Sequence, residues 1–97
     1  MRPATLSEAA LAMAADLNAT DVNALVSGAA TDSRKAREGD LFFALRGRID
    51  GADFAPEAHL RGAVATVATR RLDVPTLVVD DPLKALQRLA RWTLLRQ

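Results

Sequence analysis

The first apolar stripe of the chain is helical and lies near its beginning. One apolar helix face, at i, i+4 and i+7 spacing, is formed by Leu6, Ala10, Met13, Ala14 and Leu17. Ahead of them, Thr5-Leu6-Ser7-Glu8 has the form of a capping box, in which the Thr5 hydroxyl and the Glu8 carboxylate satisfy backbone N–H groups reciprocally. The pattern predicts a helix over Thr5–Leu17, followed by a polar turn over Asn18–Asn23.

Four shorter apolar runs predict strands. They cover Ala24–Thr31, Asp40–Leu45, Ala63–Thr69 and Thr76–Val79. Gly28 weakens the first run and suggests a bulge, and Glu38-Gly39-Asp40 is a turn before the second. The second run is continuously apolar, which is typical of a strand that is covered on both faces.

Two further helices complete the pattern. Asp53 is the expected N-cap of a helix that runs to Arg61, with Pro56 in its first turn and Gly62 ending it in the left-handed conformation. Asp81 and Pro82 open the last helix, whose expected buried stripe is Leu83, Leu86, Ala90 and Leu94, flanked by Leu89 and Trp92.

The order of these elements predicts an α/β fold, in which a mixed or mostly parallel sheet is flanked by helices. Strand, helix and strand across Leu41–Thr69 predict a right-handed parallel crossover. The link Arg70–Pro75 is too short for a crossover helix, so we expect the last two strands to be antiparallel or to lie apart. The strand order stays open.

Composition narrows the class of protein. Ninety-seven residues, 49% hydrophobic and 26% charged, are sufficient for one globular domain. Thirteen basic and twelve acidic residues give a net charge of +1, which does not indicate general affinity for nucleic acid or anionic membrane. There is no cysteine, no apolar run of the about 20 residues that span a bilayer, and no secretory signal pattern. A cytoplasmic protein is expected.

Most of the polar chemistry lies between Thr31 and Phe54. Asp32, Ser33 and Arg34 follow a strand, where backbone N–H groups, a hydroxyl and a guanidinium could bind an anion. The alternative is a plain Asx turn, in which Asp32 bonds to its own backbone. Arg46-Gly47-Arg48 suits a diphosphate, or it is a solvated turn. Two polar loops at the ends of two strands predict a site for an anionic small molecule.

Other candidate chemistry is weaker. Lys84, Arg88 and Arg91 share a face of the last helix and could touch nucleic acid, but no aromatic residues lie among them, and a solvated face is the simpler interpretation. His59 is the only histidine, so no metal site is expected. Trp92 is interpreted as a core or interdomain anchor. Neither a phosphate-binding G-x-x-x-x-G-K-[ST] loop nor a catalytic Ser/His/Asp set is apparent, and no catalytic residue is assigned.

From Thr31 to Phe54 the sequence resembles the N-terminal domain of the Mur ligases, which extend the stem peptide of peptidoglycan. The shared pattern is T-D-S-R, then G-D-L-F-F-A-L, a glycine and D-G-x-D-F. It is found here at Thr31–Arg34, Gly39–Leu45, Gly47 and Asp50–Phe54. The likeness continues through residues 61–65, 77–81 and 83–90. Within the family, the strand Leu41–Leu45 and the last helix look more like MurF than MurE.

The resemblance implies a function. In this family the domain holds the UDP end of UDP-MurNAc-tripeptide, while ATP and Mg²⁺ bound by the other ligase domains activate the peptide carboxylate for attack by D-Ala-D-Ala. The whole chain, 1–97, would be that N-terminal domain, non-catalytic alone, in a pathway that serves cell-wall biogenesis, cell shape and cell division. The residues implied for UDP are Asp32, Ser33, Arg34, Arg46, Gly47, Arg48, Asp50, Gly51 and Phe54.

The chain departs from the family pattern at two places. Between Gly47 and Asp50 it has two residues where members commonly have three, and Ala52 stands where MurF commonly has histidine. Beside the MurF-type domain, two alternatives stay open: a MurE-type ligase domain, and a non-catalytic interaction module that docks through the last helix.

Overall fold

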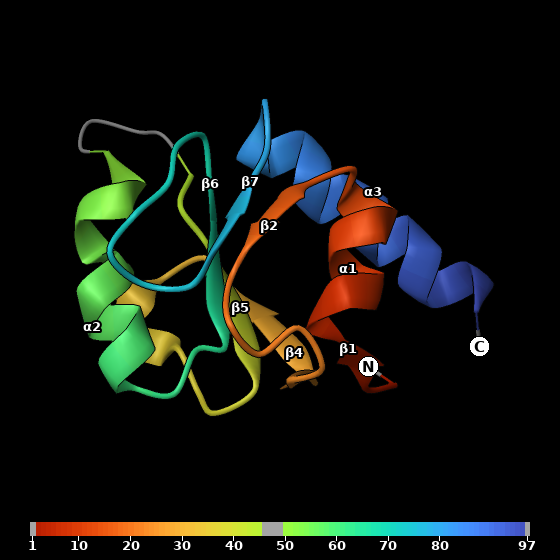
Figure 1. Ribbon diagram of the computed structural model, residues 1–97, viewed down its shortest axis with the longest axis horizontal. Coiled ribbons are helices and arrows are strands. Elements are labelled where there is room, and N and C mark those ends of the chain that lie inside the picture. Colours follow the sequence, from red (N-terminus) through yellow and green to blue (C-terminus); the bar gives the residue numbers. More distant parts are fainter. Residues whose placement is uncertain (1, 46–49, 97) are drawn as a thin grey trace.

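The computed structural model describes residues 2–45 and 50–96 and has three layers, with a sheet between helices (Figure 1). The elements in chain order are β1 (Ala4–Thr5), α1 (Leu6–Met13), β2 (Asp16–Asn18), β3 (Leu25–Val26), β4 (Gly28–Ala30), η1 (Ser33–Lys35), β5 (Asp40–Phe43), η2 (Gly51–Phe54), α2 (Ala55–Leu60), β6 (Ala65–Ala68), β7 (Thr76–Val78) and α3 (Pro82–Leu95).

The main sheet has five strands in the order β2-β7-β6-β5-β4. β4 to β7 are parallel to one another, and only β2 is antiparallel, to β7. β1 and β3 form a separate antiparallel pair. The predicted α/β fold with a mostly parallel sheet is confirmed, as is the parallel pairing of β5 with β6 across α2. Because β4 and β5 are parallel, the loops that leave them emerge at one edge of the sheet.

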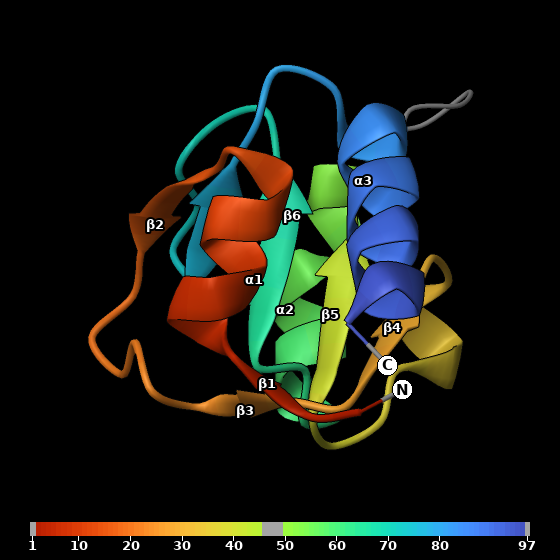
Figure 2. The same cartoon turned by 90° about the vertical axis from the view of Figure 1, so that its right-hand side faces the viewer.

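The alternation of side chains along β5 supplies both halves of the core. Leu41 and Phe43 are fully buried on the side of α1 and α3, where they meet Met13 and Leu89. Phe42 faces the opposite side, against α2. Figure 2 shows α1 and α3 side by side in front of the sheet, with α2 behind it.

The α2 side of the core consists mainly of alanine. Its buried members are Ala36, Phe42, Ala44, Ala52, Ala55, Ala58, Ala63 and Ala68. Small side chains let α2, η1 and η2 pack closely together on this side of the sheet. The same packing brings the turn after β4 close to the turn before α2.

The first helix is shorter than predicted. The capping box is confirmed: the Glu8 N–H donates to the Thr5 Oγ1 over 3.1 Å, and the Thr5 N–H donates to the Glu8 Oε1 over 2.9 Å. The helix ends at Met13 because Ala14 adopts the left-handed conformation (φ 54°), and Leu17 lies in β2 instead. The prediction of helix to Leu17 and of a turn from Asn18 was therefore wrong by a few residues.

The predicted strand Ala24–Thr31 is two strands that belong to different sheets. β3 pairs with β1, whereas β4 pairs with β5, and Ser27 separates them. Gly28 marks this change of sheet and begins β4, where we had expected a bulge within one strand.

The relation between β6 and β7 was also predicted wrongly. They are adjacent and parallel, with Val67 opposite Leu77. The link between them has no helix and crosses the α2 side of the sheet, where Leu72 and Val74 pack against the alanine-rich core. Thr76 fixes its end, because its buried hydroxyl donates to the Val74 carbonyl and accepts from the Leu72 N–H. An extended link is long enough because each strand is only three or four residues long.

The start of the second helix also differs from the prediction. Asp53 does not cap it; the carboxylate of Asp50 accepts from the Ala52 N–H and opens the short turn η2, which leads directly into α2. Pro56 lies in the first turn of α2 as expected, and Gly62 follows the helix with φ 107°, a conformation that favours glycine.

The last helix begins as predicted, but its buried face is different. The Asp81 carboxylate accepts from the N–H groups of Leu83 and Lys84. The buried residues are Pro82, Ala85 and Leu89. Of the predicted stripe, Leu86 is half-buried against the core, whereas Leu83, Ala90 and Leu94 are exposed. Trp92 is half-buried against the core and carries the Arg96 guanidinium over its ring, 4.4 Å from the centroid. Within residues 2–45 and 50–96, no helix is both long and apolar enough to cross a bilayer.

Candidate functional site

A cavity of about 770 Å³ opens where β4 and β5 end. We call it the strand-end cavity. Its described lining is Thr31, Asp32, Ser33, Arg34, Phe42, Leu45, Gly51, Asp53, Phe54 and Glu57. These residues come from the turn after β4, from β5 and its end, and from η2 and α2. The volume lies in the range of about 300–1,000 Å³ that is usual for small-molecule sites, and the carboxyl edge of parallel strands is where α/β folds bind ligands.

The turn after β4 is an Asx turn closed by an ion pair. Asp32 Oδ1 accepts from the Arg34 backbone N–H at 2.9 Å and from the Arg34 Nε at 3.1 Å, while Asp32 Oδ2 accepts from the Arg34 Nη2 at 3.0 Å. These hydrogen bonds, the side-chain ones first, lower the pKa of Asp32 from 3.8 to about 2. The Asx turn that the sequence left as an alternative is therefore present.

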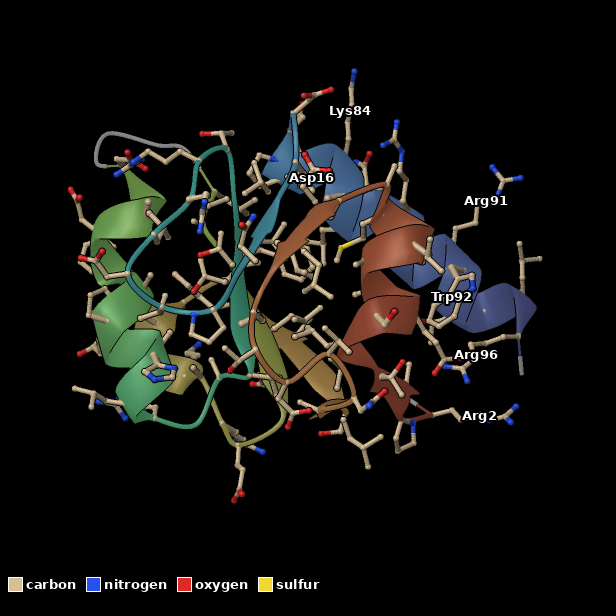
Figure 3. The ribbon with its side chains drawn as sticks, in the orientation of Figure 1. Arg2, Asp16, Lys84, Arg91, Trp92 and Arg96 are labelled. Atoms are coloured by element: carbon tan, nitrogen blue, oxygen red, sulfur yellow. The ribbon has the colours of Figure 1, made fainter. Side chains whose placement is uncertain are left out.

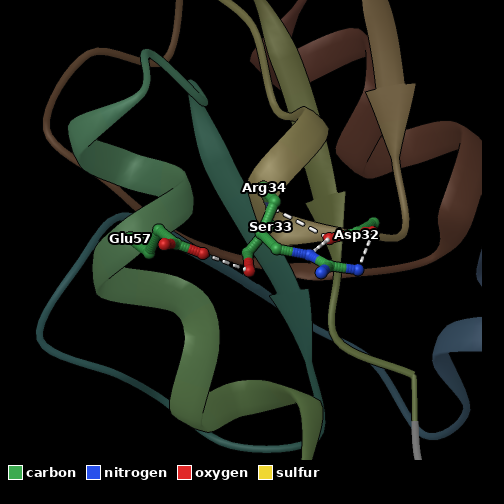
Figure 4. Close-up of polar contacts among 4 residues, drawn as sticks. All are labelled: Asp32, Ser33, Arg34 and Glu57. Carbon is green, nitrogen blue, oxygen red and sulfur yellow. Dashed lines mark hydrogen bonds and ion pairs between the residues drawn. The ribbon is translucent and has the colours of Figure 1, made fainter.

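Ser33 connects this turn to α2. It is buried, and its hydroxyl donates a 2.6 Å hydrogen bond to Oε1 of Glu57. Figure 4 shows Glu57 reaching from α2 towards η1, where it meets Ser33 beside the Asp32–Arg34 pair. The hydroxyl that was expected to be available to a ligand already has a partner for its proton.

The turn before α2 is held close to the end of β5. A Cβ on Gly51 would lie 2.5 Å from the Leu45 carbonyl oxygen and 2.9 Å from the Ala44 carbonyl carbon, both of which are backbone atoms. Asp50 precedes it, with one carboxylate oxygen on the Ala52 N–H and the other on Arg70, 3.0 Å from Nη1. Gly51 is thus required for the close approach, and Asp50 shapes the turn.

The cavity has an apolar side as well as a polar one. Phe42 is almost fully buried, Leu45 is half-buried, and Phe54 is 42% exposed. An exposed aromatic ring beside a cavity can cover the face of a planar ligand group. The charged residues in the described lining are three acidic ones, Asp32, Asp53 and Glu57, and one basic one, Arg34, which is paired with Asp32.

The structure brings together five of the nine predicted site residues. Asp32, Ser33, Arg34, Gly51 and Phe54 all line the strand-end cavity. Asp50 supports the second turn and is not in this lining. Arg46, Gly47 and Arg48 lie outside the described residues.

Sequence reasoning missed Glu57. It is 24 residues from Ser33 and lies on a helix surface, where a glutamate usually has no special role. The signal that could have found it was its position one turn into the helix that follows the second polar loop. Phe42 was interpreted only as a core residue, because nothing in a continuous apolar run marks which end lines a cavity.

The basic face of α3 is separate from this cavity. Figure 3 shows Lys84 and Arg91 pointing outward along α3, with Asp16 near Lys84. Lys84 and Arg88 line a second hollow with the acidic residues Asp16, Asp80 and Asp81. This mixture of signs does not make a uniformly positive surface. In the described part of the chain, no group of three or more His, Asp or Glu residues is arranged to hold a metal ion.

Comparison with known proteins gives the family. Residues 25–92 match the profile "Mur ligase family, catalytic domain". The chain is 52% identical over 62 residues to the UDP-N-acetylmuramoyl-L-alanyl-D-glutamate--2,6-diaminopimelate ligase of Geobacillus kaustophilus, covering 61% of this chain and 13% of that protein. It is 38% identical over 91 residues to the UDP-N-acetylmuramoyl-tripeptide--D-alanyl-D-alanine ligase of Escherichia coli, covering 91% and 20%.

A solved structure agrees with the sequence match. MurF from Acinetobacter baumannii superimposes with a TM-score of 0.83 at 28% identity, over 95% of this chain and 21% of that one. The chain thus spans between about an eighth and a fifth of the length of the proteins it matches. The profile match extends over β3 to α3, including both turns of the strand-end cavity, and on that ground the chain belongs to the Mur ligase family.

Proposed function

We propose that residues 1–97 are the N-terminal domain of a Mur ligase and that the strand-end cavity binds the UDP end of a UDP-MurNAc-peptide. One observation carries the proposal. The turn that contains Ser33 and Arg34 and the turn that contains Gly51 and Phe54 line the same cavity, although they are about 20 residues apart in sequence. Both belong to the segments on which the family resemblance rests.

The cavity suits a nucleotide because it combines an apolar side with hydrogen-bonding groups. The exposed ring of Phe54 is the proposed cover for the base, and Phe42 and Leu45 form the apolar floor. The phosphates require cations. Arg34 is the proposed partner within the described lining, and Arg46 and Arg48, which lie outside the described residues, are proposed from the sequence. Asp32 and Asp50 hold the two turns in shape.

In the complete ligase this domain would position the substrate and would not carry out the reaction. Binding energy gained at the nucleotide can be used to orient the distant peptide carboxylate. Family membership supports the use of ATP by the whole protein, and we propose that ATP and Mg²⁺ bind to other domains, where the carboxylate is activated. The product would enter peptidoglycan synthesis, and a cytoplasmic location goes with that role.

The branch of the family is a finer proposal. We favour the MurF type, which adds D-Ala-D-Ala to a tripeptide, because the E. coli ligase with that name matches over 91% of the chain. The MurE type is the second candidate, supported by the 52% identity of the Geobacillus ligase over the shorter segment. Assay of the full-length enzyme with D-Ala-D-Ala and with diaminopimelate, each with its own UDP-MurNAc-peptide, decides between them.

Binding of UDP to the 97-residue chain tests the main proposal. We expect saturable binding by isothermal titration, and weaker binding for Phe54→Ala and Arg34→Ala. Leu60→Ala is the control, since Leu60 is 87% exposed on α2 and is not in the cavity lining. Absence of UDP binding, or equal affinity in all four proteins, would contradict the proposal.

A further inference from the structure

The hydrogen bond between Ser33 and Glu57 has a fixed direction. A carboxylate can only accept, so the proton in the 2.6 Å contact belongs to the Ser33 hydroxyl. Ser33 is 5% exposed and is held in η1 on the cavity wall, while Glu57 is an exposed residue of α2 on the same wall. With its proton committed, Ser33 Oγ can offer a ligand only lone pairs.

This part of the cavity is therefore a hydrogen-bond acceptor. Glu57 contributes carboxylate oxygens beside Ser33 Oγ, and Asp53 adds a further carboxylate to the lining. At the Ser33–Glu57 contact itself, a phosphate group would meet the negative charge of these carboxylates, whereas a ligand N–H or O–H group would meet oriented acceptors.

We propose that Glu57 is a specificity-determining residue, which acts through Ser33 to select a pyrimidine with an N–H donor at position 3 over one with an acceptor there. The inference rests on the proposed binding of UDP. Uracil carries that donor as its imide N–H, and cytosine has an unprotonated ring nitrogen at the same position. Cytosine would place a lone pair against the lone pairs of Ser33 Oγ, so that neither the cytosine nitrogen nor these lone pairs would have a hydrogen-bond donor, although the Ser33 hydroxyl would still donate to Glu57.

A purely structural role for the same hydrogen bond makes a different prediction. If Glu57 only tied α2 to η1, its removal would weaken the binding of every nucleotide to the same extent. Selection by Glu57 instead changes the ratio of the affinities for UDP and CDP. An unpaired buried polar group costs about 1–3 kcal/mol, and about 1.4–2.7 kcal/mol within that range corresponds to an expected preference of roughly tenfold to a hundredfold.

The experiment measures UDP and CDP binding to the 97-residue chain by titration followed by NMR. We expect wild type to prefer UDP by at least about tenfold. In Glu57→Gln the partner of the Ser33 hydroxyl is an amide, which can donate as well as accept, so the Ser33 proton is no longer fixed in direction. The ratio of UDP affinity to CDP affinity should therefore fall towards one, mainly because CDP binds more tightly. Ser33→Ala should lower the ratio in the same direction. Glu38→Gln is the matched control, because it makes the same change at an exposed glutamate that is not in the cavity lining, and it should keep the wild-type preference.

Wild type alone also tests the inference, which matters if a variant fails to fold. 3-Methyluridine diphosphate lacks the N–H at position 3 and should bind at least about tenfold more weakly than UDP. Equal binding of UDP, CDP and the methylated nucleotide, with shifts at Gly51 and Phe54, would overturn this inference and leave the proposed function intact. A UDP preference that survives in both Glu57→Gln and Ser33→Ala would also overturn it. If UDP does not bind in the strand-end cavity at all, the proposed function itself fails.

Discussion

The guanidinium of Arg34 is held by the carboxylate of Asp32, two residues earlier, through two parallel hydrogen bonds of 3.1 Å and 3.0 Å. The same carboxylate also accepts from the Arg34 backbone N–H. The arginine at the mouth of the strand-end cavity therefore has a defined position before any ligand arrives. A preorganised cation loses less conformational entropy when it binds an anion.

This pair predicts a dependence of stability on pH. The pKa of Asp32 is lowered from 3.8 to about 2 in the folded chain, chiefly by its hydrogen bonds to the Arg34 side chain. A carboxyl with a lowered folded-state pKa stabilises the fold above its unfolded pKa, and that contribution is lost as the pH falls from about 4 to about 2. NMR titration of the Asp32 carboxyl carbon measures the value directly. Arg34→Gln should raise it towards 3.8, and titration of wild type near 3.8 would contradict the geometry.

Gly51 predicts a steric effect on the second turn. A methyl group there would meet the backbone of Ala44 and Leu45, and neither atom can move without displacing the end of β5. We expect Gly51→Ala to lower the free energy of unfolding by about 1–3 kcal/mol in urea denaturation. Leu60→Ala, at an exposed position of α2, should change it by less than about 0.5 kcal/mol. Similar stability in the two variants would show that η2 does not pack as described.

The buried face of α3 predicts that two leucines of this helix contribute very differently to stability. Leu89 is 2% exposed and packs in the main core, whereas Leu94 is 73% exposed. Leu89→Ala should cost about 2–5 kcal/mol of stability, and Leu94→Ala less than about 0.5 kcal/mol. The two substitutions are chemically identical and lie on one helix, so thermal or urea unfolding compares them directly. A larger loss of stability for Leu94→Ala than for Leu89→Ala would contradict the described packing and agree with the buried stripe predicted from the sequence.

Local sequence signals predicted where helices and strands occur better than they predicted which strands pair and which helix faces are buried. The cap at Thr5, the cap at Asp81 and the turn glycine Gly62 depend on residues close in sequence, and all three are found. The pairing of β6 with β7 depends on how a seven-residue link crosses the α2 side of the sheet, which no local pattern records. The predicted buried face of α3 was wrong because the core covers the side of the helix that carries Ala85 and Leu89, whereas Leu83 and Leu94 lie further round the helix.

In the candidate site, too, local features could be predicted from the sequence and long-range contacts could not. Two polar turns could be found from residue types, and the structure places Ser33 and Gly51 around one cavity. Glu57 could not be found, because its contact with Ser33 arises only when α2 packs against η1. Arg46, Gly47 and Arg48 lie outside the described residues, and their roles stay predictions.

The most direct test of the central claim is an amide NMR map of the 97-residue chain during titration with UDP. We expect the largest shifts at Ser33 and Arg34 after β4 and at Gly51 and Phe54 before α2, all saturating with one dissociation constant. Shifts confined to other parts of the chain, such as the outer face of α3, would contradict the account, as would no shifts at any UDP concentration.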